Sequence, residues 1–225
     1  MKVPIIYEDN HLLIIEKPIN VPVQEDSSGD PDLLSILKDD IKVRYQKPGN
    51  VYLGLVHRLD RPVGGVMVFA KTSKAASRLS DMLRRNVIER KYLAVVHGKP
   101  DKDKGQLVHY LYKDKQKNKV SVVSRENANG KKAVLNYEVL DSKNGLSLLS
   151  VYLQTGRPHQ IRVQLSTIGH PIYGDQKYGE HLTKPGKQIA LWSYSLELEH
   201  PVRKEPMHTI CLPPKYEPWD MWDIK

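Results

Sequence analysis

The segment from Gln106 to Thr155 restricts the fold more than any other part of this 225-residue chain. It holds four short apolar stretches, separated by turn residues, at 107–112, 120–123, 134–140 and 146–153. Stretches of this length that are rich in β-branched and aromatic residues predict strands, and Asn144-Gly145 predicts a tight hairpin between the last two. The segment therefore predicts an antiparallel meander.

The rest of the chain adds strands and helices. Further strands are predicted at 3–7, 12–15, 51–56, 66–70, 91–96, 194–198 and 207–212. One helix is predicted to start with Asp30 as its cap and Pro31 at its first position, and a second with Ser73 as its cap. A third is predicted to open at Pro158 and close at Gly169. This mixture predicts an α+β fold with a mixed, mostly antiparallel sheet and short flanking helices and loops.

Charge and composition narrow the function classes. The 35 Lys and Arg residues outnumber the 26 Asp and Glu residues, and the formal net charge of +9 suits a polyanionic partner without identifying one. A single cysteine, Cys211, excludes an intramolecular disulfide and a thiolate zinc cluster, and it favours a reducing, cytoplasmic location. The longest early apolar run, 12–15, is too short for a signal peptide or a membrane span, so no membrane partner is expected. No repeat or linker divides the chain, which predicts one domain over 1–225.

Nucleotide-binding and metal-binding motifs are absent from the sequence. There is no G-x-G-x-x-G, and the residues around Gly186 lack the spacing and the Ser or Thr of a phosphate-binding loop. The nine histidines show no H-E-x-x-H or comparable spacing. We therefore expect neither a metal nor a cofactor.

One carboxylate is flanked by two arginines in a loop between apolar segments. This is Asp60, which Arg58 and Arg61 bracket. Neighbouring guanidinium groups favour an ionised carboxylate, and an ionised Asp can act as a nucleophile toward carbon. On spacing alone, however, an Asp–Arg pair that only fixes the loop is the better explanation.

Two further positions allow both a structural and a functional interpretation. Arg162 lies on the predicted short helix at the edge of its apolar stripe, where it can reach a carboxylate on a neighbouring strand end or remain a surface arginine. Tyr92 begins an apolar strand, where a tyrosine usually belongs to the core but can also stack on a nucleobase.

Four ordered motifs together resemble the RluA-type RNA pseudouridine synthases. They are Glu8-Asp9-Asn10 through Glu16-Lys17-Pro18; His57-Arg58-Leu59-Asp60 through Phe69-Ala70-Lys71-Thr72; Lys91-Tyr92-Leu93-Ala94; and Gly156-Arg157-Pro158-His159-Gln160-Ile161-Arg162-Val163 with Gly169-His170-Pro171-Ile172 and Gly174-Asp175. The chain departs from the family at Val63-Gly64-Gly65, where Thr-Ser-Gly is usual, and at Pro158, where Thr or Ser is frequent.

The resemblance implies a pseudouridine synthase fold and isomerisation of uridine in ribosomal or transfer RNA, without cofactor or metal, by a monomer. It implies that Asp60 is the catalytic carboxylate, that Arg162 pairs with it, and that Tyr92 packs against the uracil. The chain begins directly with the first motif, so no separate N-terminal RNA-binding domain is expected. Which uridine is modified, and whether Asp60 attacks the sugar or the base, stay open.

Basic residues are the candidate RNA contacts. Arg58 is the candidate to fill the gap that an extruded base leaves in the RNA. A basic stretch with alternating lysines predicts a movable hairpin arm that contacts phosphates, although a solvated turn would have the same pattern. Its members are Lys113, Lys115, Lys117, Lys119, Arg125, Lys131 and Lys132. The predicted RNA-binding residues are Arg58, Arg61, Arg157, His159, Lys113, Lys115, Lys117 and Lys119.

Two other classes of function remain as alternatives. A glycoside or nucleoside hydrolase would also use Asp60, but it needs a second carboxylate, and the neighbourhood in sequence offers arginines instead. A non-catalytic RNA-binding module is disfavoured because Asp60, Tyr92 and Arg162 are all present.

Overall fold

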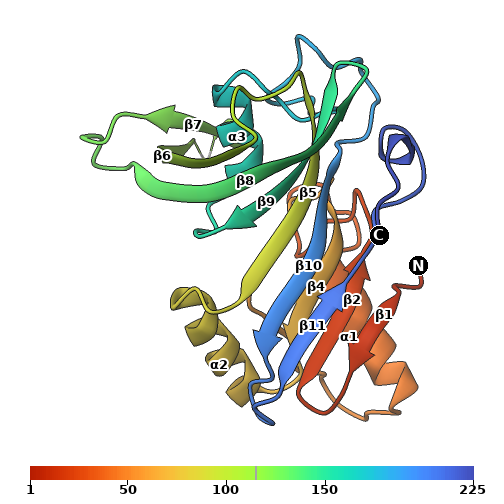
Figure 1. Cartoon of the computed structure of the whole chain (residues 1–225). Helices are drawn as coiled ribbons and strands as arrows, with labels where there is room; N and C mark the ends of the chain where they lie inside the picture. Colours follow the sequence, from red (N-terminus) through yellow and green to blue (C-terminus); the bar gives the residue numbers. More distant parts are fainter. Residues whose placement is uncertain (115) are drawn as a thin grey trace. The chain divides into compact units, whose positions relative to one another are not determined.

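A computed structural model describes residues 1–114 and 116–225, which form two compact units (Figure 1). The first unit contains residues 1–89 and 193–211, and the second contains residues 90–192 and 212–225. The described elements are strands of a mixed sheet, most of whose pairs are antiparallel, with three α-helices and one short 3₁₀ helix, as predicted for an α+β fold. The expectation of one catalytic domain over 1–225 stays a prediction.

The first unit is built on a set of strands, of which the central ones are buried. β1 (Ile5–Glu8) pairs with β2 (Leu12–Lys17), and β2 pairs with β4 (Gly64–Ala70), which also pairs with the short β3 (Gly54–Leu55). β10 (Leu191–Glu199) lies next to β4 and pairs with β11 (Pro206–Ile210), the partner predicted for it. Every residue of β4 is buried, and a strand covered on both faces has a continuous apolar sequence instead of an alternating one.

Two helices of the first unit begin later or earlier than predicted. α1 (Leu33–Arg44) is capped by Asp32, whose side chain accepts the N–H of Ser35, and not by Asp30, whose carboxylate pairs with Arg61. α2 (Ser73–Arg84) is capped by the residue before the predicted cap, Thr72. In both cases two polar residues compete for one cap position, and only one of them places its oxygen on a free N–H of the first turn.

The predicted strand 51–56 is mostly wrong, because only Gly54 and Leu55 pair with β4. Beyond these two residues, the edge of β4 that faces β3 is occupied by a side chain: the N–H of Val68 donates to Nε2 of His57 at 3.1 Å. A side chain thus takes the position that a longer β3 would have used.

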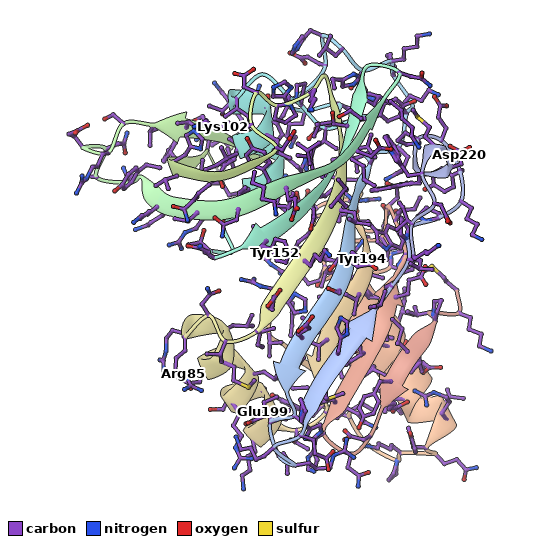
Figure 2. All side chains as sticks on the ribbon, in the orientation of Figure 1. Arg85, Lys102, Tyr152, Tyr194, Glu199 and Asp220 are labelled. Carbon is purple, nitrogen blue, oxygen red and sulfur yellow. The ribbon has the colours of Figure 1, made fainter. Side chains whose placement is uncertain are left out.

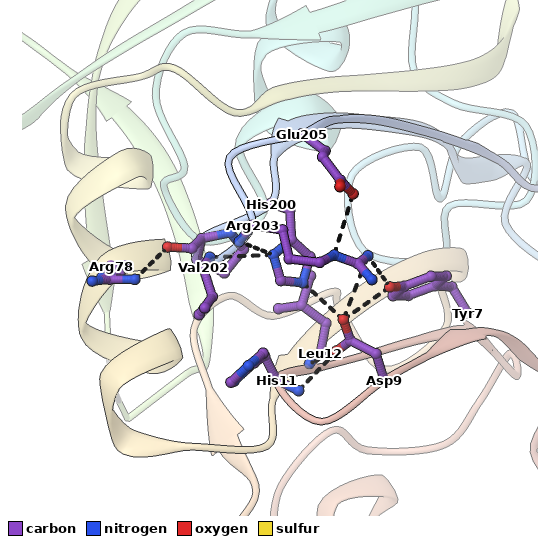
Figure 3. Close-up of polar contacts among 10 residues, drawn as sticks. Tyr7, Asp9, His11, Leu12, Arg78, His200, Val202, Arg203 and Glu205 are labelled. Carbon is purple, nitrogen blue, oxygen red and sulfur yellow. Dashed lines mark hydrogen bonds and ion pairs between the residues drawn. The ribbon is translucent and has the colours of Figure 1, made fainter.

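A buried polar network joins the β1–β2 turn to the β10–β11 turn (Figure 3). Oδ1 of Asp9 accepts the backbone N–H groups of residues 11 and 12, both at 2.7 Å, and Oδ2 lies 2.9 Å from Nε2 of His200. Nδ1 of the fully buried His200 accepts the N–H groups of residues 202 and 203, so its proton is on Nε2. Burial opposes the ionisation of Asp9, but these hydrogen bonds lower its pKa to about 2. Glu199, labelled in Figure 2, ends β10 just before this turn.

The second unit contains the strands predicted from 106–155 in a different order. β5 (Glu89–His97) pairs with β9 (Leu146–Leu153), β9 with β8 (Lys131–Lys143), β8 with β6 (Lys104–Asp114), and β6 with β7 (Lys119–Val123). The meander is wrong because the long β6 uses one edge for β7 and the other for β8. The hairpin at Asn144-Gly145 is confirmed, with φ values of 53° and 76°.

The remaining helix of the second unit is α3 (Gln160–Thr167), which starts two residues after the predicted Pro158. His159 precedes it in the left-handed region with φ 51°, and Oε1 of Gln160 accepts the N–H of Arg157, so 157–160 forms a turn before the helix. The predicted end at Gly169 is confirmed by its φ of 85°. The 3₁₀ helix η1 (Trp219–Met221) follows near the C-terminus.

Candidate active site

Asp60 lies in a turn whose approach is anchored to β4. Its carbonyl oxygen accepts the N–H of Val63 at 2.9 Å, and its side chain is half-buried. Leu59 is buried, and His57 is hydrogen-bonded to the N–H of Val68 in β4. The residues on the N-terminal side of Asp60 are therefore fixed to the core of the first unit.

The residues on the C-terminal side of Asp60 are held by Lys17. This last residue of β2 has no exposed surface, and its Nζ donates to the carbonyl oxygens of Arg61 at 3.0 Å, Val63 at 2.8 Å and Pro18 at 2.8 Å. An ammonium group has three N–H donors, and here it meets three carbonyl acceptors. Lys17 thus fixes the backbone of the turn immediately after Asp60.

The charge of Lys17 is coupled to Asp60. Burial lowers the pKa of Lys17 to about 7, while the negative charge of Asp60 acts in the opposite direction. A buried ammonium group without a nearby anion is strongly disfavoured. The negative charge of Asp60 therefore favours the cationic form of Lys17 within the first unit.

The two arginines that bracket Asp60 in the sequence contact the segment 20–30. Arg61 pairs with Asp30 and donates through Nε to the carbonyl oxygen of residue 20 at 3.2 Å. Arg58 is exposed and donates to Oε1 of Gln24 at 3.2 Å. Arginines adjacent in sequence to Asp60 thus hold a neighbouring loop, and the cation that holds the Asp60 turn itself is Lys17.

The turn leads into β4 through a glycine that has no room for a side chain. Gly65 has φ 113°, and a Cβ atom there would lie 2.2 Å from the carbonyl oxygen of Ser193. In the segment Val63-Gly64-Gly65, the first two residues differ from the usual Thr-Ser-Gly, and Gly65 agrees with it. The close approach of two backbones explains why this position requires glycine.

Tyr92 belongs to the second unit. It lies in β5 opposite Val151 of β9, and only 6% of its surface is exposed. This burial agrees with the core interpretation and leaves the predicted contact with uracil a prediction.

Arg162 forms a buried, bidentate ion pair with Asp175. Its Nε and Nη2 donate to Oδ2 and Oδ1 of Asp175, each at 2.8 Å. Asp175 is almost completely buried; burial favours its neutral form, but the hydrogen bonds and charge of Arg162 lower its pKa. Arg162 is thus a buried side chain of α3 and not a surface arginine, and its pairing with Asp60 stays a prediction.

The predicted RNA-binding residues of the second unit lie on or near the β6–β7 hairpin and α3. Lys113 and Lys119 are exposed on the paired strands and Lys117 is exposed in the connection, whereas Lys115 lies outside the described residues. Arg157 donates from Nε to the carbonyl oxygen of residue 132 in β8 at 3.0 Å. Nδ1 of His159 lies 2.6 Å from the hydroxyl of Tyr178. The predicted hairpin is confirmed, and its contact with RNA stays a prediction.

The described part of the chain contains no group of three or more His, Cys, Asp or Glu side chains that could hold a metal ion. Within the same residues, no helix has the length and apolar character needed to cross a membrane.

Sequence reasoning did not assign roles to Lys17, Asp175 and Tyr178. Lys17 and Asp175 fall within the motifs of the family resemblance, which was the available signal for both. A lysine that ends an apolar strand suggests solvent exposure, so the burial of Lys17 has no local signal.

Comparisons with known proteins agree with these motifs. A family model described as RNA pseudouridylate synthase matches residues 11–167. An uncharacterized RNA pseudouridine synthase of Bacillus subtilis is 35% identical over 204 residues, which cover 89% of this chain and 65% of the relative. The ribosomal large subunit pseudouridine synthase D of Nitrosomonas europaea is 36% identical over 206 residues, which cover 88% of this chain and 58% of the relative. The chain thus spans less than two thirds of the length of these two curated relatives.

A solved structure supports the same assignment of the fold. The human protein RNA Pseudouridylate Synthase Domain Containing 4 superposes with a TM-score of 0.78 at 25% identity, and the match covers 94% of this chain and 89% of that one. This likeness confirms the predicted fold.

Proposed function

The chain belongs to the RNA pseudouridylate synthase family, and on this basis we propose that it converts uridine in RNA into pseudouridine with Asp60 as the catalytic carboxylate. The observation that carries the proposal is the family match over residues 11–167, which contains the motifs of Asp60, Tyr92 and Arg162 in order. Because the chain spans only part of its curated relatives, its activity and its substrate are both proposals.

The proposed reaction is an isomerisation. The bond between the ribose carbon 1′ and uracil nitrogen 1 breaks, the uracil turns, and carbon 5 bonds to carbon 1′. Carbon 5 then loses its proton and nitrogen 1 ends with one, so substrate and product have the same atoms. Such a reaction needs a nucleophile or an anion at the sugar and a group that assists proton removal, which side chains can supply.

Asp60 suits the first of these roles. Its turn is held on both sides. Before Asp60, His57 accepts a hydrogen bond from the N–H of Val68 in β4, and after it Lys17 donates to the carbonyl oxygens of residues 61 and 63. A carboxylate that is fixed before substrate binds loses little freedom in the transition state. The proposal covers two mechanisms, in which Asp60 attacks either the sugar or the base.

Tyr92 and Arg162 complete the proposed catalytic set on the strength of their motifs. We assign Tyr92 to packing against the uracil and to assisting removal of the carbon 5 proton. Arg162 is assigned to pairing with Asp60 and keeping it ionised. The ion pair with Asp175 supports this role, because it holds the guanidinium group in one buried orientation.

The proposed substrate is ribosomal or transfer RNA. The printed name of the Nitrosomonas europaea relative refers to the large ribosomal subunit, and the net charge of +9 suits a polyanion. An enzyme that acts on a stacked base must extrude it, and the exposed Arg58 in the Asp60 loop is proposed to fill the gap. The monomeric state and the cytoplasmic location stay predictions.

The test is tritium release from ribosomal and transfer RNA transcripts labelled at carbon 5 of uridine. We expect release with the wild type and none with Asp60→Asn. Asp39→Asn removes an exposed carboxylate from α1 of the same unit and serves as the matched control, which is expected to keep full activity. Thermal unfolding of both variants checks that the fold is kept. Equal activity of Asp60→Asn and the wild type would refute the assignment of the carboxylate.

The same reactions distinguish the two alternative functions. A hydrolase would release free uracil and leave abasic sites, whereas an isomerase leaves the base attached. A non-catalytic RNA-binding module would bind the transcripts and release neither tritium nor uracil.

A further inference from the structure

Two side chains with proposed functions, Arg162 and His159, both contact Tyr178, a residue with no proposed function so far. The guanidinium carbon of Arg162 lies 5.2 Å from the centre of the Tyr178 ring, within the range of a cation–π contact. The hydroxyl lies 2.6 Å from Nδ1 of His159 and accepts the N–H of Val120 at 2.9 Å. One half-buried side chain therefore contacts the proposed catalytic arginine, a proposed RNA-binding histidine and the β6–β7 hairpin.

The backbone of Tyr178 is fixed to the same elements. Its N–H donates to Oδ1 of Asp175 at 3.2 Å, and its carbonyl oxygen accepts from the Ser166 hydroxyl of α3 at 2.7 Å. Because Oδ1 of Asp175 also accepts from Arg162, the ring, the ion pair and α3 form one connected group. The backbone from which the Tyr178 side chain extends is thus held by two hydrogen bonds.

The hairpin is docked on this group next to its turn. Val120 follows Lys119 directly in β7, and the adjacent Lys177 donates from Nζ to the carbonyl oxygen of Asn118 at 2.8 Å. The Tyr178 ring also packs against a cluster of buried residues from β6, β7, β8 and α3, which are Leu111, Val120, Ala133 and Val163. The position of the exposed lysines on the hairpin is therefore tied to the position of α3.

The hydroxyl of Tyr178 connects the hairpin and His159 at the same time. It accepts from Val120, and it can donate its own proton to Nδ1 of His159, which leaves the proton of the neutral imidazole on Nε2. Loss of the hydroxyl would remove one hydrogen bond from β7 and one from His159 while the ring stays beneath Arg162.

We propose that Tyr178 is a positioning residue that holds the hairpin and His159 in register with Arg162, so that RNA bound by the hairpin lysines meets the catalytic side chains in the correct alignment. This inference rests on the proposed RNA substrate. In it, the hydroxyl serves RNA binding and the ring supports Arg162.

The test compares Tyr178→Phe with Tyr173→Phe. Tyr173 lies in the same unit, and its hydroxyl donates to the exposed Glu217, so its variant removes a hydrogen bond that does not involve the hairpin. We expect Tyr178→Phe to raise KM for RNA about three- to tenfold, the effect of one or two net hydrogen bonds, with kcat unchanged. Tyr173→Phe should leave both unchanged. Tyr178→Leu, which also removes the ring, should lower kcat as well.

A double-mutant cycle tests whether the hydroxyl acts through the hairpin. The second change neutralises the described lysines of the hairpin in one variant, which carries Lys113→Gln, Lys117→Gln and Lys119→Gln. If Tyr178 positions these lysines, its removal costs little RNA affinity once they are gone. Additive losses, a fall in kcat for Tyr178→Phe at unchanged KM, or no effect of Tyr178→Phe would each overturn the inference.

Equilibrium binding separates this inference from the proposed function. If the wild type forms no pseudouridine, the proposed function fails, and the dissociation constant for fluorescein-labelled RNA stem-loops then decides the role of Tyr178 alone. Weaker binding of Tyr178→Phe than of Tyr173→Phe would support it. Equal binding, or no binding of RNA by the wild type, would overturn it.

Discussion

Nζ of Lys17 lies 2.8 Å from the carbonyl oxygen of Val63, 46 residues later in the chain. This hydrogen bond joins the end of β2 to the turn that carries Asp60, and it places a buried amine against the backbone of that turn. The conformation of the turn therefore depends on a residue with no access to substrate. A change at Lys17 should affect the chemistry without affecting the surface that meets RNA.

Lys17→Met is expected to lower kcat by about 100-fold, because a displacement of about 1 Å at a reacting group can cost that much. KM for RNA should change little, since Lys17 has no exposed surface. Lys42→Met, which removes an exposed lysine of α1, is the control and should behave as wild type. Steady-state pseudouridine formation below the unfolding temperature measures both constants. An increase in KM without loss of kcat would contradict the role assigned to Lys17.

The pH dependence of stability offers a second test of the buried lysine. The pKa of Lys17 is about 7 in the folded chain and about 10.4 in an unfolded one. Between these values the unfolded state binds more protons, so the free energy of unfolding should rise with pH, by at most about 1.4 kcal/mol per unit. Urea unfolding of the wild type and Lys17→Met from pH 6 to pH 10 checks this. Parallel pH profiles of the two proteins would show that Lys17 does not titrate in this window.

Asp175→Asn is expected to destabilise the second unit by roughly 3–5 kcal/mol, because it leaves the buried Arg162 without its counterion. The folded pKa of Asp175 lies below its unfolded value of about 3.9. Its stabilising contribution should therefore be complete above that value and disappear as pH falls through the lower, folded pKa. Urea unfolding at pH 7 and below pH 4 measures both effects. The exposed Asp223→Asn is the control, and equal stability of the two variants at pH 7 would contradict the prediction.

The parts of the fold that were predicted correctly depend on local signals. Asn144-Gly145 defines its hairpin because both residues adopt positive φ, which asparagine and glycine tolerate better than other residues. The helix starts were missed by one or two residues, because neighbouring polar residues such as Asp30 and Asp32 are equally good caps in sequence. The meander was wrong because the choice of edge on β6 depends on packing against other elements.

The site shows the same division. The position of Asp60 in an ordered motif is a property of the sequence, and the family match agrees with that motif. The contacts that give the site its geometry join distant residues: Lys17 with Val63, Arg162 with Asp175, and Val120 with Tyr178. Only the folded chain brings such pairs together, as it also does for Arg61, which pairs with Asp30 and Asp26.

Arg58→Ala is expected to lower activity on structured RNA and to leave activity on a short unstructured oligonucleotide unchanged. The physical reason is that only a stacked uridine must be extruded, at a cost of a few kcal/mol, before it can react. Arg58→Lys keeps the charge but not the planar group and serves as the comparison. Tritium release from both RNAs gives the ratio, and an equal loss on the two substrates would argue against the role in extrusion.

Neutralising the hairpin lysines is expected to weaken the dependence of RNA binding on salt. Each lysine that contacts a phosphate displaces counterions, so the slope of log K against log salt should fall by about 0.7 per contact for single-stranded RNA, and by up to about 2 for three contacts. The variant replaces Lys113, Lys117 and Lys119 by Gln, and a control replaces Lys2, Lys42 and Lys47, which are exposed in the first unit. Fluorescence anisotropy between 50 and 200 mM KCl provides the slopes. Over this range a slope difference of about 2 changes the affinity by roughly one decade. If both triple variants reduce the slope equally, the hairpin lysines contribute to RNA binding only through the net charge of the protein. If only the hairpin variant reduces the slope, the hairpin lysines contact the RNA directly.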